Sequence, residues 1–132
     1  MANLDHVRRI ASVLPGSAES PGDQFGFSVL NRGKHRGFVW QWRERVDPKR
    51  PRVLNPRVLA VRVANLFEKD AIIQAEGEKF FTEPHYNGYP AILVRLEAVE
   101  SDELESLIVE AWRCMAPRAL VAAFDAAQDR RR

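Results

Sequence analysis

Apolar residues recur every three or four positions in four stretches of the chain, a spacing typical of amphipathic helices. Each stretch begins at a helix-start signal. Asn3, Asn65 and Ser101 are good N-cap residues, Glu68 completes a capping-box pattern with Asn65, and Pro117 suits the first turn of a final helix. The predicted helices cover about residues 4–14, 65–75, 101–115 and 117–128.

Between these helices, short runs rich in β-branched and aromatic residues alternate with turn residues, which predicts strands. In the second strand, strict alternation places Phe38, Trp40 and Trp42 on one face, and we expect Trp40 to lie in the core. The predicted strands cover about residues 25–30, 38–43, 58–63, 80–81 and 91–97, with a turn at 31–37 and an exposed loop at 44–56.

The predicted order of elements is α-β-β-β-α-β-β-α-α. Because helices and strands do not alternate, this order excludes a doubly wound parallel sheet. It favours an α+β fold, with an antiparallel sheet that carries its helices on one face. A chain of 132 residues with 45% hydrophobic and 29% charged residues is ordinary for a globular protein, and we expect residues 1–132 to form a single domain.

The sequence carries few signals of a special cellular location. Cys114 is the one cysteine, so no disulfide can form within the chain, and its place beside an apolar helical stripe predicts a buried thiol. The N-terminal residues lack the apolar core of a signal peptide, and no apolar run has the length of a membrane span. We therefore expect a cytoplasmic protein without membrane contact.

Charge is distributed unevenly, although the net charge is only +2. The segment 32–62 holds ten Lys and Arg residues against two acids, whereas the segment 97–110 holds six acids and no base. Several cations on one face are what neutralisation of a phosphate backbone requires. The predicted nucleic-acid contacts are Lys34, Arg36, Arg43, Arg45 and Arg62.

No catalytic arrangement is visible in the sequence. The three histidines, His6, His35 and His85, have neither zinc-ligand spacing nor a cysteine pair beside them, so we expect no metal site. Glycine-rich phosphate loops and the G-x-S-x-G pattern of hydrolases are also absent. We therefore expect no cofactor and no enzymatic activity.

The segment 85–90, His-Tyr-Asn-Gly-Tyr-Pro, is the most unusual local sequence. Asn87-Gly88 predicts a tight hairpin turn at a sheet edge. The segment is interpreted either as aromatic packing around a turn or as a ligand site, because His85, Tyr86 and Tyr89 can all form hydrogen bonds.

Several ordered motifs resemble the MmcQ/YjbR family. The matching residues are Leu14-Pro15-Gly16, Phe38-Val39-Trp40, Lys69, Phe80-Phe81 followed by Pro84-His85-Tyr86-x-Gly88-Tyr89-Pro90, and the helix from Leu104 to Trp112 followed by Ala116-Pro117. The resemblance implies a CyaY-like, or double-wing, fold in which helices cover one side of an antiparallel sheet. It also implies DNA binding, and it supplies no catalytic residues.

Three functions remain open from the sequence. The first is a non-enzymatic domain that binds DNA through its basic segment. The second is a protein-interaction module, in which the basic and acidic segments meet in self-association or contact separate partners. The third is a small-ligand binder or an unrecognised enzyme, centred on the tip formed by His85, Tyr86 and Tyr89, which requires a concave pocket there.

Overall fold

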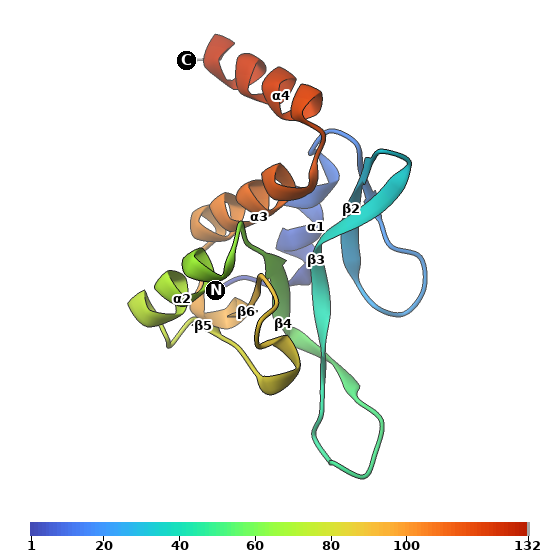
Figure 1. Cartoon of the computed structure of the whole chain (residues 1–132), viewed down its shortest axis with the longest axis vertical. Helices are drawn as coiled ribbons and strands as arrows, with labels where there is room; N and C mark the ends of the chain where they lie inside the picture. Colours follow the sequence, from blue (N-terminus) through green and yellow to red (C-terminus); the bar gives the residue numbers. More distant parts are fainter. Residues whose placement is uncertain (132) are drawn as a thin grey trace.

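A six-stranded antiparallel sheet forms the centre of the molecule, and α-helices pack against one of its faces (Figure 1). The structure is a computed structural model that describes residues 1–131. Its elements are α1 (Leu4–Ser12), β1 (Ser17–Glu19), β2 (Gly26–Asn31), β3 (Lys34–Glu44), β4 (Val53–Arg62), α2 (Leu66–Ala75), β5 (Phe80–Phe81), η1 (Pro84–Tyr86), β6 (Ala91–Arg95), η2 (Leu96–Ala98), α3 (Ser101–Met115) and α4 (Arg118–Arg130).

The strand order is β1-β2-β3-β4-β6-β5, and each neighbouring pair is antiparallel. The predicted α+β fold with an antiparallel sheet is therefore confirmed. The sequence interpretation missed β1, which was expected to be loop. Its three residues pair with β2 at the sheet edge, where so short a strand has no periodic pattern to detect.

The two faces of the sheet bury different sets of residues. The larger core lies under the helices and contains Trp112, Leu104 and Ile108 of α3, all fully buried. Side chains from α1, α2 and α4 pack against the same core. The opposite face carries a smaller cluster, which includes Trp42 and Tyr86. The helices thus cover one face of the sheet, as the element order predicted.

A β-bulge divides the aromatic residues of β3 between these two faces. Phe38 lies in the core under the helices, whereas Trp40 and Trp42 belong to the opposite cluster, so the prediction of one shared face is wrong. The register of β2 and β3 shifts at Phe27 and Ser28, and this leaves Phe38 as the extra residue. A bulge interrupts the strict alternation on which the prediction rested.

Most helix boundaries follow the predicted signals. Asn3 caps α1 in a reciprocal capping box with His6, and Asn65 caps α2 by accepting a hydrogen bond from the backbone of Glu68. Ser101 is the first residue of α3 rather than its cap, which is Glu100. Pro117 directly precedes α4, as predicted. Local capping chemistry therefore fixed the helix starts to within one residue.

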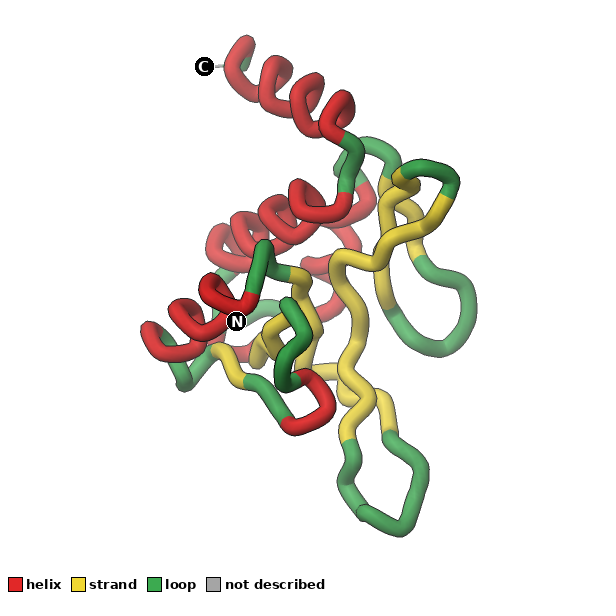
Figure 2. The backbone as a smooth tube through the Cα atoms, viewed as in Figure 1, coloured by secondary structure: helices red, strands yellow, loops and turns green. Residues whose placement is uncertain are grey.

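The two hairpins have longer strands and shorter connecting turns than expected. β2 and β3 are joined by a two-residue turn at Arg32-Gly33, both with positive φ, in place of the predicted turn over 31–37. β3 and β4 form a second hairpin whose tip, residues 45–52, projects away from the helices (Figure 2). The polar and basic residues of these strand ends obscure their β-structure in the sequence.

Candidate functional site

An open groove of about 900 Å³ lies where the β2–β3 hairpin, the end of β4 and the α3–α4 junction meet. We call it the arginine groove, because arginines from each of these elements line it. The arginines are Arg32, Arg36, Arg62, Arg113 and Arg118.

The sheet register directs the hairpin residues into this groove. Arg36 pairs with Val29, which is fully buried under the helices, so both side chains lie on the helix-covered face. Lys34 pairs with Asn31, whose side chain donates a hydrogen bond to the carbonyl of Met115 at 2.9 Å. That bond ties the hairpin to the end of α3, and Lys34 therefore lies on the groove side as well.

Two of the arginines are already engaged by the protein. Arg62 donates to the hydroxyl of Tyr89 at 2.9 Å, and its guanidinium lies over the Tyr89 ring. Arg113 forms ion pairs with Glu110 and Asp125 and lies over the ring of Phe124. These contacts hold both guanidinium groups at the groove wall, and the carboxylates also neutralise the charge of Arg113.

The other cations at the groove are exposed and carry no recorded ion pair within residues 1–131. They are Arg32, Lys34, Arg36 and Arg118. Four uncommitted cations around one concavity can neutralise several negative charges at once, and guanidinium groups bind phosphate or carboxylate oxygens in pairs.

The turn position of Arg32 costs backbone energy. Its φ is +54°, a left-handed conformation that asparagine and glycine adopt with less strain. Replacing Arg32 by Asn is expected to raise the free energy of unfolding by about 0.5–1 kcal/mol. The same variant should weaken anion binding to the groove. Urea denaturation and anion titration of one sample measure both effects, and a fall in stability would contradict this account of the turn.

The five predicted nucleic-acid contacts separate into two groups. Arg36 and Arg62 line the arginine groove, and Lys34 lies beside it. Arg43 and Arg45 lie at the other end of β3, beside the tip of the β3–β4 hairpin. At about 3.3 Å per residue, the strand places roughly 30 Å between Arg36 and Arg45. The structure therefore does not bring all five residues together.

Basic residues at the β3–β4 tip mostly organise the loop itself. Arg45 donates to the carbonyls of Pro48 and Arg50, and Arg50 pairs with Asp47. Arg52 forms a largely buried ion pair with Glu83 at 3.0 Å. These arginines thus have structural partners, whereas Arg32 and Arg36 at the β2–β3 tip have no ion pair within residues 1–131.

Sequence reasoning missed three groove residues, Arg32, Arg113 and Arg118. Arg32 lies inside the basic segment but was left out of the predicted contacts. Arg113 and Arg118 flank the break between α3 and α4, about 80 residues along the chain from Arg32 and Arg36. In the sequence, the one signal for these two arginines was their position on either side of Pro117, which marks the break between the helices.

The tip of residues 85–90 packs over the second face of the sheet. Tyr86 is buried, and its hydroxyl accepts a hydrogen bond from Trp40 Nε1 at 2.9 Å. Burial raises the pKa of the Tyr86 phenol. Tyr89 and His85 are exposed at the rim, each with its ring edge-on to Tyr86. The aromatic residues of the tip thus pack together and onto Trp40.

The Asn87-Gly88 turn is not the predicted two-residue hairpin. Asn87 is extended and only Gly88 has positive φ, so Tyr86–Tyr89 forms a type II turn, in which the Tyr89 amide donates to the Tyr86 carbonyl. The Nζ of Lys69, from α2, donates to the carbonyls of both Tyr86 and Tyr89 at 2.6 and 2.8 Å. Lys69 is 3% exposed, and burial lowers its pKa.

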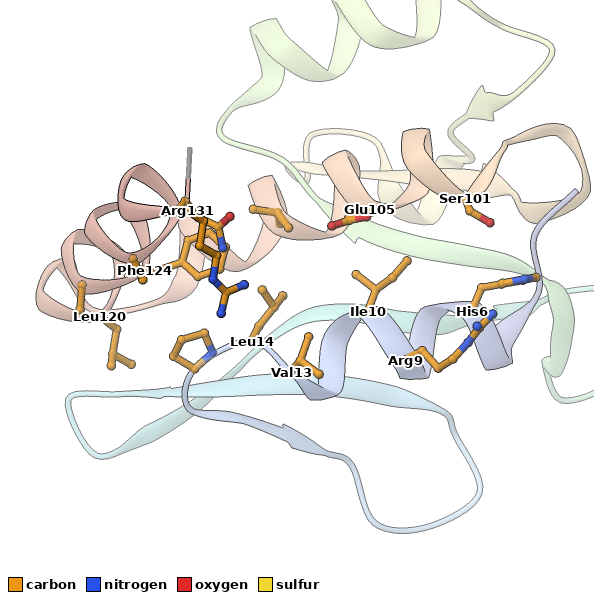
Figure 3. Close-up of a pocket in the computed structure, with 15 residues that line it drawn as sticks. His6, Arg9, Ile10, Val13, Leu14, Ser101, Glu105, Leu120, Phe124 and Arg131 are labelled. Atoms are coloured by element: carbon orange, nitrogen blue, oxygen red, sulfur yellow. The ribbon is translucent and has the colours of Figure 1, made fainter.

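Two further grooves lie along α3. One, of about 740 Å³, separates α1 from α4 and has mostly apolar walls that include Ile10, Leu120 and Phe124 (Figure 3). The other, of about 450 Å³, separates α2 from α3 and shares Arg62 and Cys114 with the arginine groove.

Cys114 is exposed, contrary to the prediction of a buried thiol, because it lies at the edge of the apolar stripe of α3.

Within residues 1–131, no group of three or more His, Cys, Asp or Glu side chains is arranged to hold a metal ion. In the same part of the chain, no helix combines the length and apolarity required to cross a membrane.

Comparisons with known proteins place the chain among bacterial relatives. No family model matches it. It is 37% identical over 124 residues to uncharacterized protein Rv2570 of Mycobacterium tuberculosis and to uncharacterized protein Mb2600 of Mycobacterium bovis, covering 94% of this chain and 96% of each relative.

Among solved structures, protein DR2400 of Deinococcus radiodurans, which carries a DUF419 domain, has the same fold. The TM-score is 0.63 at 22% identity, over 85% of this chain and 77% of that one. This structural similarity shows the fold alone. The 37% identity to the mycobacterial proteins extends along nearly the whole chain and shows common descent. The chain therefore belongs to the same family as Rv2570 and Mb2600.

Proposed function

We propose that this protein is a non-enzymatic domain that binds DNA through phosphate contacts made at the arginine groove. The observation that carries the proposal is the set of four uncommitted cations around that groove, on the β2–β3 hairpin and at the start of α4. They are Arg32, Lys34, Arg36 and Arg118.

The resemblance of several sequence motifs to the MmcQ/YjbR family supports the same proposal. The structural neighbour is a DUF419 protein, and DUF419 is related to MmcQ/YjbR-type folds. The matching residues have clear structural roles here, since Lys69 holds the 86–89 turn and Trp112 fills the core. Because these residues have structural roles, they account for a shared fold but not for DNA contacts. The DNA contacts are therefore proposed from the charges of this chain.

Binding should be sequence-independent and strongly dependent on salt. Four phosphate contacts give a slope of about −3.6 in a plot of log K against log salt concentration. Fluorescence anisotropy with a labelled duplex, titrated at several salt concentrations, measures this slope. Absence of binding at low salt with DNA at tens of micromolar, roughly the range of non-specific binding, would contradict the proposal.

Two charge-matched variants locate the contact surface. The groove variant replaces Arg32, Lys34 and Arg36 by Gln, and the control variant replaces Arg43, Lys49 and Arg50 by Gln at the other hairpin tip. We expect the groove variant to lower affinity at least tenfold and to reduce the slope by about 3, while the control changes little. Equal losses in both variants would indicate a general charge effect and reject the groove as the binding surface.

A further inference from the structure

The arginine groove continues into the groove between α2 and α3, which differs from it in chemistry. Arg62 and Cys114 line both grooves and mark the point where they join. On one side of this point lie the arginines described above. On the other side, the walls include aliphatic residues from three elements, namely Val63 after β4, Ile72 of α2 and Leu107 of α3.

The combined groove runs along one side of α3. Leu107 and Cys114 are seven residues apart, which corresponds to about 10 Å along a helix. An aliphatic stretch of this length therefore ends directly at a cluster of cations. Such an arrangement complements a molecule that has an anionic head and an aliphatic chain.

The junction also carries positive charge, because Arg62 has no ion pair within residues 1–131. Tyr89 holds one side of its guanidinium, and its Nε is enclosed by the protein. Arg36 and Arg118 line the same groove without an ion pair in the described chain. The acids of the aliphatic half, Glu68 and Glu110, disfavour an anionic group there, so they help to set the direction of a bound ligand.

We propose that the two grooves form one binding site for a small amphiphile, with a phosphate or carboxylate head in the arginine groove and a short aliphatic chain between α2 and α3. The chain would contact Val63, Ile72 and Leu107, and the head would contact Arg36, Arg62 and Arg118. This site does not depend on DNA binding, because its aliphatic half plays no part in phosphate-backbone contacts.

Cys114 provides a direct probe of occupancy, because it is the one cysteine of the chain, is exposed and lines both halves. The rate at which an alkylating reagent modifies Cys114 is measured in the presence of each candidate ligand, below any micelle-forming concentration. The ligands are octyl phosphate, octanoate, inorganic phosphate and octanol. We expect octyl phosphate to bind at least tenfold more tightly than inorganic phosphate, a ratio that burial of about two methylene groups supplies. Octanol should give little protection, and comparison with octanoate identifies the preferred head.

Substitutions separate the tail contact from the head contact. Leu107→Gln is expected to weaken octyl phosphate binding at least fivefold without changing the affinity for inorganic phosphate, whereas Arg36→Gln should weaken both. Val13→Gln is the matched control, since Val13 is an exposed aliphatic residue of the separate α1–α4 groove. If Leu107→Gln does not fold by circular dichroism, Ile72→Thr tests the same contact.

Three results would overturn the proposal. The first is equal binding of octyl phosphate and inorganic phosphate. The second is protection of Cys114 that rises with protein concentration alone, because a second copy of the chain would then be the occupant. The third is protection by duplex DNA but by none of the amphiphiles. Failure of DNA binding in the salt titration, with octyl phosphate still protecting Cys114, would reject the proposed function and leave this site intact.

Discussion

Replacing Trp112 by Ala is expected to lower the free energy of unfolding by about 4 kcal/mol. Trp112 is fully buried at the centre of the core under the helices. Its indole nitrogen donates a hydrogen bond to the carbonyl of Pro15 at 2.9 Å, and its ring packs 5.1 Å from that of Phe124. The substitution therefore creates a large cavity and removes contacts to the Pro15 turn and to α4 at once. Urea denaturation followed by circular dichroism measures the loss.

Two further substitutions identify the origin of this loss. Trp112→Phe retains most of the ring but leaves the Pro15 carbonyl without its donor, which should cost about 1–2 kcal/mol beyond the smaller loss of volume. Trp40→Ala removes a half-buried ring from the opposite face and should cost less than Trp112→Ala. A cost for Trp40→Ala equal to that for Trp112→Ala would show that the second face contributes as much as the helix-covered core.

Replacing Lys69 by Met is expected to lower the free energy of unfolding by about 3 kcal/mol. The Nζ of Lys69 is the buried donor to two backbone carbonyls of the 86–89 turn. Methionine fills a similar volume but leaves both acceptors unpaired, and each costs about 1–3 kcal/mol. Because Tyr86 packs on Trp40 from the same turn, the loss should also change the tryptophan fluorescence. Lys79→Met, at a half-exposed lysine paired with Glu76 and Glu103, is the control and should cost less.

The lowered pKa of Lys69 should also make the free energy of unfolding depend on pH. Burial lowers the pKa of Lys69 in the folded protein below its ordinary value of about 10.4. The unfolded chain then binds the proton more tightly, so the free energy of unfolding rises with pH between the lowered pKa and about 10.4. This rise should be missing from Lys69→Met. Parallel pH profiles for the two proteins in urea denaturation would contradict the assignment.

The sequence was sufficient to predict the helices and the fold class. Asn3, Asn65 and Pro117 act within one turn of their own position, so capping chemistry marks helix starts without knowledge of the tertiary structure. The apolar stripe of α3, with Leu104 and Trp112 on its buried side, likewise follows from the periodicity of one helix. The order of elements then left an antiparallel sheet as the natural packing.

The details of the sheet depended on pairing between strands. The bulge at Phe38 and the turn at Arg32-Gly33 result from the register with β2, which alternation within β3 does not reveal. For the same reason, the prediction placed Phe38 on the same face as Trp40 and Trp42 and gave the turn five residues too many. The buried hydrogen bonds of Lys69 likewise join α2 to a turn 17 and 20 residues away.

The uneven charge of the chain was visible in the sequence, which places ten Lys and Arg residues in the segment 32–62. Which of those cations share a surface was decided only by the tertiary structure. The β3 strand carries Arg36 and Arg45 to opposite ends, while the packing of α3 brings Arg113 and Arg118 beside Arg36. Composition and periodicity are local properties and determine the elements; a groove is assembled by long-range packing, and its residues are neighbours only once the sheet has paired and the helices have covered it.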